Sequence, residues 1–175
     1  MNLSFRKLFE GDMKRYGFCP EKYERKFHYH FRKCQTTNNT ILLLYHRYMY
    51  KRIREARGVE IPYSTQIEEG LYLGHTCMVH VNEGVKIGRN VNLHKGVTIG
   101  QENRGKRKGV PTIGNNVWIG VNAVVVGNVK IGDDVLIAPN SFVNCDVPSH
   151  SVVVGNPCVI KHKDFATADY INNTV

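Results

Sequence analysis

The sequence has 175 residues, of which 42% are apolar, and this is enough for one hydrophobic core. We therefore expect a single domain, with room for a small appendage. The longest uninterrupted apolar run is Ile41 to Tyr45, far short of the roughly 20 residues that a membrane helix needs. The N-terminus also lacks the apolar stretch of a signal peptide. These features argue against a membrane-spanning or secreted chain, and we expect a cytoplasmic protein.

The net charge of +9 is placed unevenly. Residues 1–57 hold 14 of the 24 Lys and Arg but only 5 of the 15 Asp and Glu, so the rest of the chain is neutral. A basic segment of this kind can bind nucleic acid or an anionic surface. A solvated helical face is the more frequent explanation, because charge alone seldom identifies a partner. We expect no nucleic-acid binding and at most a weak association with an anionic surface.

The cysteines argue against a disulfide framework and a zinc site. Their number is odd, their spacings are irregular and no CxxC pair occurs: Cys19, Cys34, Cys77, Cys145 and Cys158. We expect free thiols that mostly serve packing.

Residues 1–57 are predicted to be helical. Apolar side chains recur there at spacings near three to four, at Leu3, Leu8, Tyr16, Leu43, Tyr45, Tyr48, Met49 and Ile53. The Thr-Thr-Asn-Asn cluster at 36–39 is suited to cap a second helix that runs from about Thr40 to Ala56. Gly58 follows at a plausible C′ position.

A different pattern begins at Ile67. Aliphatic residues recur every six positions in two phases, at Val81, Ile87, Leu93 and Ile99, and at Ile113, Ile119, Val125, Ile131, Ile137 and Val143. Mostly small residues lie four positions after them, at Val85, Val91, Val97, Val117, Ala123, Val129, Val135 and Ser141. A period of six over this length fits neither an amphipathic helix nor a single alternating strand.

The period fits a prism in which each hexad forms one flat face and three hexads form one coil. Pairs such as Asn115-Asn116 and Asp133-Asp134 stand where the chain turns between faces, because Asn and Asp tolerate positive φ. We therefore expect an all-β main domain, a parallel β-helix, behind a small helical segment. Residues 101–112 contain no hexad and should form a protruding basic loop, either a functional loop or a tolerated insertion.

Several motifs between Val59 and Ile160 occur together in one known group of proteins. They are Val59-Glu60-Ile61, Leu73-Gly74-His75, Val97-Thr98-Ile99-Gly100, Ile119-Gly120, and Val147-Pro148 through Gly155-Asn156-Pro157. In these motifs the sequence resembles the hexapeptide-repeat serine acetyltransferases and their relatives that acetylate sugars of bacterial surface polysaccharides, particularly the colanic acid and capsule branch. The resemblance implies a left-handed β-helix, an exception to the usual handedness of parallel crossovers.

The resemblance also implies a catalytic pair. Three histidines precede the loop, His75, His80 and His94, and each alone is as well explained by a surface or structural role. The family motif selects His75 as the general base, with the acidic residue 15 positions earlier, Glu60, orienting it. This chain has glutamate where serine acetyltransferases have aspartate, so the carboxylate is retained.

The acceptor site departs from the serine enzymes. They carry an aspartate before the catalytic histidine and an Arg-His pair in the loop, where this chain has Gly74 and Gly109-Val110. Each lost charged hydrogen bond weakens binding of a zwitterion by about 1.5 to 3 kcal/mol. We therefore expect an acetyl-CoA-dependent O-acetyltransferase that acts on a sugar hydroxyl. The residues expected near this acceptor are Gly74, Arg104, Lys106 and Lys108, with Arg107 beside them.

For acetyl-CoA, the resemblance implies a groove between subunits of a homotrimer. The residues expected along it are Gly100, Gln101, Gly120, Val121 and Ala138, with Lys161 and Lys163 near the 3′-phosphate. The backbone amide near Gln101 is the expected oxyanion donor. Trp118 stands at an outward-facing position, where it either lines the site or packs on the surface. No metal is predicted.

Two alternatives remain open at this point. The chain is suited to be a serine O-acetyltransferase with an altered acceptor loop, or a non-catalytic β-helix that acts as an interaction module. The second is disfavoured because a scaffold does not need Glu60 and His75. We expect a basic helical segment at 1–57, a β-helix catalytic domain at 58–163 with its loop at 101–112, and a C-terminal tail at 164–175.

Overall fold

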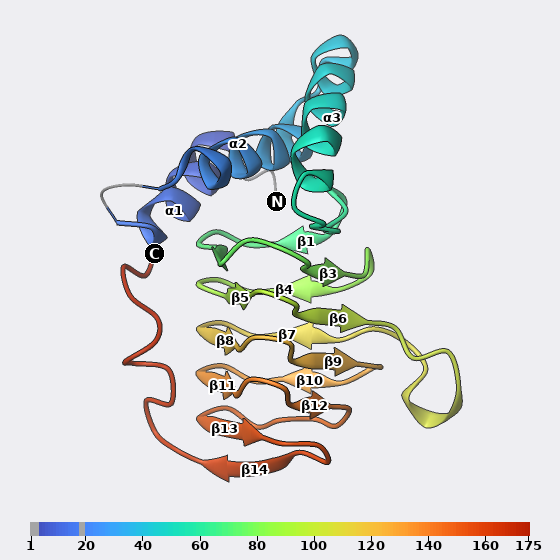
Figure 1. The fold of residues 1–175 in the computed structure, drawn as a ribbon, viewed down its shortest axis with the longest axis vertical. Coiled ribbons are helices and arrows are strands. Elements are labelled where there is room, and N and C mark those ends of the chain that lie inside the picture. Colours follow the sequence, from blue (N-terminus) through green and yellow to red (C-terminus); the bar gives the residue numbers. More distant parts are fainter. Residues whose placement is uncertain (1–3, 18–19) are drawn as a thin grey trace.

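A computed structural model describes residues 4–17 and 20–175. Three helices precede a stack of short strands, which the chain winds into a β-helix of triangular cross-section (Figure 1). The helices are α1 (Phe5–Arg15), α2 (Lys22–Thr36) and α3 (Thr40–Glu55). The predicted parallel β-helix and the helical segment before it are confirmed. Leu3 and Cys19, to which the sequence assigned a helical position and a free thiol, lie outside the described residues.

The strands form three sheets, one on each side of the prism. The β1 sheet contains β1 (Gln66–Ile67), β4 (Lys86–Ile87), β7 (Thr112–Ile113) and β10 (Lys130–Ile131). The β2 sheet contains β2 (Tyr72–Gly74), β5 (Asn92–His94), β8 (Val117–Ile119), β11 (Val135–Ile137), β13 (Ser151–Val154) and β14 (Val159–His162). The β3 sheet contains β3 (His80–Val81), β6 (Thr98–Gly100), β9 (Val124–Val126) and β12 (Phe142–Val143). All named strand pairs are parallel except β13 and β14.

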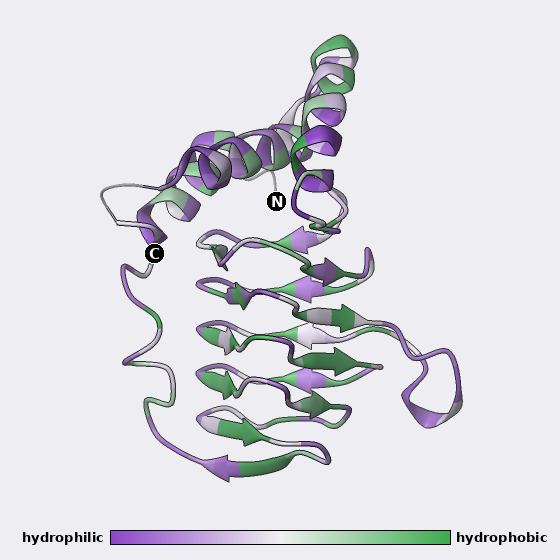
Figure 2. Ribbon diagram, viewed as in Figure 1, coloured by the Kyte–Doolittle hydropathy of each residue, from purple (hydrophilic) through white to green (hydrophobic). Residues whose placement is uncertain are grey.

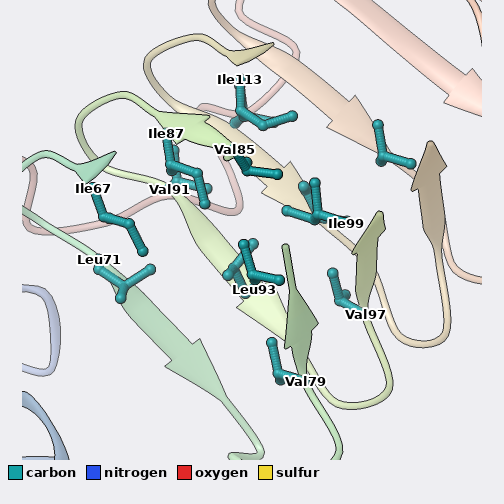
Figure 3. Close-up of a cluster of buried hydrophobic side chains, with 14 of the residues drawn as sticks. Ile67, Leu71, Val79, Val85, Ile87, Val91, Leu93, Val97, Ile99 and Ile113 are labelled. Carbon is teal, nitrogen blue, oxygen red and sulfur yellow. The ribbon is translucent and has the colours of Figure 1, made fainter. Parts of the chain in front are cut away.

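The hexad aliphatics stack on one another from coil to coil. Ile99 pairs with Val125 and Val125 pairs with Val143, and the other two sheets repeat this register. Every aliphatic residue of both hexad phases is at most 4% exposed. Figure 3 shows part of this interior, where Ile87, Leu93 and Ile99 point inward from three different sheets. Burial of these side chains is the main driving force that holds the coils together.

The corners between the sheets also follow the sequence. Asn116 and Asp134, the second members of the two predicted pairs, have φ values of 52° and 53°. The left-handed region is open to Asn and Asp at small cost. Between β6 and β7 the predicted loop leaves the prism, contains a short 3₁₀ turn (Gly105–Arg107) and is closed by a bridge between Glu102 and Gly109 (Figure 1). Figure 2 shows that this loop is hydrophilic.

The N-terminal helices cover the open end of the first coil. Phe27, Phe31 and Tyr50 join the apolar interior, and the Tyr50 hydroxyl donates to the Ile61 carbonyl at 2.6 Å. The predicted cap of α3 is present, since Asn39 Oδ1 accepts from the Leu42 amide. Its C-cap is Ala56, so Gly58 lies one residue beyond the expected C′ position, with φ 62°. None of the described helices has the length and apolar character needed to cross a bilayer.

The C-terminal segment runs back along the β2 sheet toward α1 (Figure 1). Asp134 accepts hydrogen bonds from the amides of Ala166 and Thr167 near the last coils. At the other end, Asn90 and Val175 exchange two hydrogen bonds near the first coil. The segment therefore touches both ends of the stack.

Candidate functional site

His75 lies at a corner that carries two extra residues. Leu73 pairs with Leu93, 20 positions later, whereas Val81 pairs with Ile99, 18 positions later. The difference arises because five residues, 75–79, connect β2 to β3, whereas three, 95–97, connect β5 to β6. His75 is exposed and has φ 52°, an uncommon conformation for a residue other than glycine. The longer corner thus presents this imidazole outside the prism.

A cavity of about 590 Å³ contains the His75 side chain. One wall is aromatic, because the ring of Trp118 lies between those of His94 and Tyr170, at centroid distances of 4.7 and 5.1 Å. The rings of His75 and His94 are 6.4 Å apart. Tyr72 stands beside them on the same outer face of the β2 sheet. Trp118 therefore lines the cavity of His75, the first of the two predicted possibilities.

The two guanidinium groups of this cavity are already paired. Arg15 donates to the Gly70 carbonyl, to Asn92 Oδ1 and to the Asn172 carbonyl, and burial lowers its pKa to about 10. Arg57 lies within 4.0 Å of the Glu21 and Glu24 carboxylates and over the ring of Tyr23. Neither cation is therefore free to bind an acidic ligand without giving up a partner.

The predicted contact between Glu60 and His75 is absent within the described chain. Glu60 forms a parallel bridge with His80, and its Oε1 lies 3.9 Å from His80 Nε2. Both line a separate cavity with Gly100, on the side of the β3 sheet. The expectation failed for a geometric reason: 15 residues is less than the 20-residue first coil, so Glu60 falls one sheet away from the strand that leads into His75.

The basic loop lies at a different corner from His75. It leaves after the β3 sheet, and the amides of Gly127 and Asn128 hold it against the next coil. Arg104 and Lys106 line a cavity of about 500 Å³ there, while Lys108 is exposed outside it. A single chain therefore does not bring together the two groups predicted to bind the acceptor.

The residues predicted for acetyl-CoA are also spread over the prism. Gly120 and Ala138 follow β8 and β11, beyond Gly74 and His94 along the same edge of the β2 sheet. Val121 lies at the adjacent corner, and Gln101 is exposed at the base of the loop, bonded to Asn103. Lys161 is exposed on β14. Gly74 and His75 are the only two predicted site residues among the described ones that line the same cavity as His94 and Trp118.

Sequence reasoning missed several residues of the His75 cavity. Arg15 and Tyr16 come from α1, and Tyr170 comes from the C-terminal segment, far from the repeat. No local signal marks them, because their approach depends on how the helices and the tail dock. His94 was visible only as one of three histidines before the loop. Its position, one strand pair away from Gly74, was a signal that the register of the coils makes readable.

The described residues offer no obvious metal site. No three His, Cys, Asp or Glu side chains among them gather closely enough to hold an ion. Four cysteines outside the undescribed positions are free thiols, and Cys145 and Cys158 lie close to each other, with their Sγ atoms 3.8 Å apart.

Comparison with known proteins agrees with this geometry. Residues 111–145 match the family described as bacterial transferase hexapeptide (six repeats). The coils are hexapeptide repeats of the bacterial transferase type. This hexapeptide-repeat segment begins after the loop and includes β8 to β12, where the hexads are uninterrupted.

Two relatives extend the hexapeptide-repeat match toward the N-terminus. The serine acetyltransferase of Helicobacter pylori is 38% identical over 107 residues, which are 61% of this chain and 63% of the relative. The serine acetyltransferase of Staphylococcus aureus is 41% identical over 107 residues, 61% of this chain and 50% of the relative. The chain thus spans less than two thirds of the length of these relatives.

Solved structures are similar over most of the chain. Soybean serine acetyltransferase complexed with serine has a TM-score of 0.74 at 25% identity, covering 90% of this chain and 70% of the soybean chain. Neisseria gonorrhoeae serine acetyltransferase in complex with serine has a TM-score of 0.69 at 28% identity, covering 90% and 69%. The shared fold includes both the hexapeptide-repeat coils and helices before them.

Proposed function

We propose that this chain is an acetyl-CoA-dependent O-acetyltransferase in which His75 is the general base. The observation that carries the proposal is the exposed imidazole at the enlarged corner after β2, in a cavity on a hexapeptide-repeat prism. The likeness to serine acetyltransferases supports the same reaction class.

In this reaction His75 accepts the proton of the acceptor hydroxyl as its oxygen attacks the thioester carbonyl. A C–O bond forms, and the negative charge of the tetrahedral intermediate falls on the former carbonyl oxygen, where the Gln101 amide is the proposed donor. The C–S bond then breaks, and the departing CoA sulfur takes the proton from the imidazolium. The products are an acetyl ester and CoA with a free thiol.

A homotrimer is part of this proposal. Within one chain the basic loop and His75 occupy different corners of the prism. In a closed threefold arrangement the loop corner of one subunit can face the His75 corner of the next. The acetyl-CoA residues, from Gly100 to Lys161, then line the groove between subunits. Analytical ultracentrifugation should give a trimer, and a fully active monomer would contradict it.

Serine is the acceptor that the relatives support best, since the compared proteins are named serine acetyltransferases. This reverses the preference for a sugar that the sequence suggested. A sugar hydroxyl remains the second candidate for a specific reason. Residue 74 is glycine, the nearby guanidinium groups are paired, and the cavity wall is aromatic, which suits a neutral ring.

The deciding experiment measures CoA thiol release from acetyl-CoA with L-serine, methyl galactosides and nucleotide sugars. We expect His75→Ala to lower kcat by about 100-fold or more, the usual contribution of a general base. His162→Ala is the matched control, because this imidazole is exposed on β14, away from the cavity. Full CoA release by His75→Ala, with any acceptor, would refute the catalytic assignment. A Glu60→Gln variant, followed by its pH profile, tests whether the carboxylate acts on His75 in the assembled protein.

A further inference from the structure

A second imidazole, that of His94, lies flat against Gly74 beside the proposed base. The two residues are direct partners in the pairing of β2 with β5. A Cβ atom placed on Gly74 would lie 2.5 Å from both Nδ1 and Cε1 of His94, closer than real Cβ contacts allow. Gly74 does not have positive φ. The absence of a side chain at residue 74 is therefore explained by the ring above it and not by the backbone.

The His94 ring is held from the other side as well. Its centroid lies 4.7 Å from that of Trp118 and 6.4 Å from that of Tyr72. Such tilted aromatic contacts fix the ring plane. The position of Nδ1 next to Gly74, and so next to the corner of His75, is thereby set by packing on both faces.

His94 is not satisfied by the protein. Its Nε2 is buried and has no hydrogen-bond partner among the described residues. Buried polar atoms without partners are few in native proteins and call for an explanation, such as a role in binding. Burial, with the neighbouring His75 as a second cause, lowers the pKa of His94 to about 4. The ring is therefore neutral at pH 7 and does not compete with His75 for the proton of the reaction.

We propose that His94 is a specificity-determining residue of the acceptor site, where its neutral imidazole accepts a hydrogen bond from an O–H or N–H group of the acceptor. This proposal rests on the acetyl transfer proposed above. His94 fills the space beside the base that a side chain at residue 74 would otherwise occupy. Recognition at this point thus uses a neutral nitrogen and an aromatic wall instead of a carboxylate.

The first test separates acceptor binding from chemistry. For each acceptor that supports CoA release, His94→Ala should raise the KM of the acceptor about tenfold, the effect of losing one hydrogen bond. The KM of acetyl-CoA should stay within about twofold. His94→Asn, which keeps a polar side chain, should recover part of the acceptor affinity, and His162→Ala should match the wild type. An unchanged acceptor KM in His94→Ala would overturn the role of His94 while leaving the proposed function intact.

A second readout does not require turnover. Trp118 is the single tryptophan of the chain and touches the His94 ring, so its fluorescence should change as an acceptor is titrated. His94→Ala should shift that titration to higher acceptor concentration, and an identical curve would overturn the proposal. Turnover with none of the acceptors would remove the proposed function and this proposal together.

The packing step has its own test. Gly74→Ala should lower the melting temperature in the wild type, because the new Cβ meets the His94 ring. In the His94→Ala background the same substitution should have a much smaller effect. Equal losses in both backgrounds would contradict the assignment of Gly74 to the space needed by His94.

Discussion

Asp12 and Arg32 form a bidentate ion pair that is completely buried between the helices and the first coil. Nε of Arg32 donates to Asp12 Oδ2 at 2.7 Å and its NH2 group donates to Oδ1 at 2.9 Å, with both side chains 0% exposed. Arg32 also donates to the carbonyls of Ile67 and Glu68. The pair therefore connects α1 and α2 to the strand that begins the β-helix.

Removal of one partner should be strongly destabilising. Arg32→Met leaves the Asp12 carboxylate buried without its main counter-charge, and we expect a loss of about 3 to 5 kcal/mol in the free energy of unfolding. Urea unfolding measures this loss. Arg6→Met is the matched control, because its ion pair with Glu10 is exposed and should contribute less than about 1 kcal/mol. Similar losses for the two variants would contradict the assigned role of the pair.

The same carboxyl makes stability depend on acid. Burial by itself would raise the pKa of Asp12, but the charges of Arg32 and His28 and their hydrogen bonds lower it below the ordinary value. A carboxyl with a depressed folded pKa contributes stability above its unfolded pKa of about 3.9 and loses it as pH falls through the folded value. We expect the melting temperature to fall below about pH 4. Asp12→Asn should be less stable at pH 7 and should show a smaller fall; a slope equal to that of the wild type would argue against Asp12 as its source.

Core residues of the coils should be far less tolerant than exposed apolar residues of α3. Ile119 is 0% exposed and pairs with Leu93 and Ile137 in neighbouring coils. Ile119→Ala should lower the free energy of unfolding by about 2 to 5 kcal/mol. Ile41 is 79% exposed, and Ile41→Ala should change it by less than about 0.5 kcal/mol. Chemical denaturation of both variants provides the comparison, which fails if Ile119→Ala is as mild as Ile41→Ala.

Corner residues should be selected by backbone conformation. Asn140 is exposed and has φ 59°. Asn140→Val should cost about 1 to 2 kcal/mol, because a β-branched side chain is strained in the left-handed region. Asn140→Gly should be close to neutral. Thr112→Val, on an exposed strand position, is the control for the added apolar surface. Equal stability of the Val and Gly variants at residue 140 would show that φ does not decide the residue there.

The repeat made the fold predictable because each inward position is repeated in the next coil. The alignment of Ile99, Val125 and Val143 follows from counting in sixes, as do the turns at Asn116 and Asp134. The loop was predictable because it breaks that count. Each of these features depends on residues close together in sequence or one coil apart.

The site was less predictable, for the opposite reason. His75 could be selected, but the first coil has 20 residues, and the two extra ones move Glu60 out of the predicted pairing. Tyr170 and Arg15 reach the cavity through docking of segments that have no repeat. Their positions depend on contacts across more than 50 residues, such as the one between Arg15 and Asn92, which no local pattern encodes.

The C-terminal segment changes how this stack can come apart. In a repeat protein whose units touch only their neighbours, the end units can fray one at a time. Here Asp134 holds one end of the segment and Asn90 the other, so a late coil and an early coil share one strap. Fraying from either end must release that strap and the aromatic wall that Tyr170 completes. Unfolding of the coils and loss of the His75 cavity should therefore occur as one cooperative event.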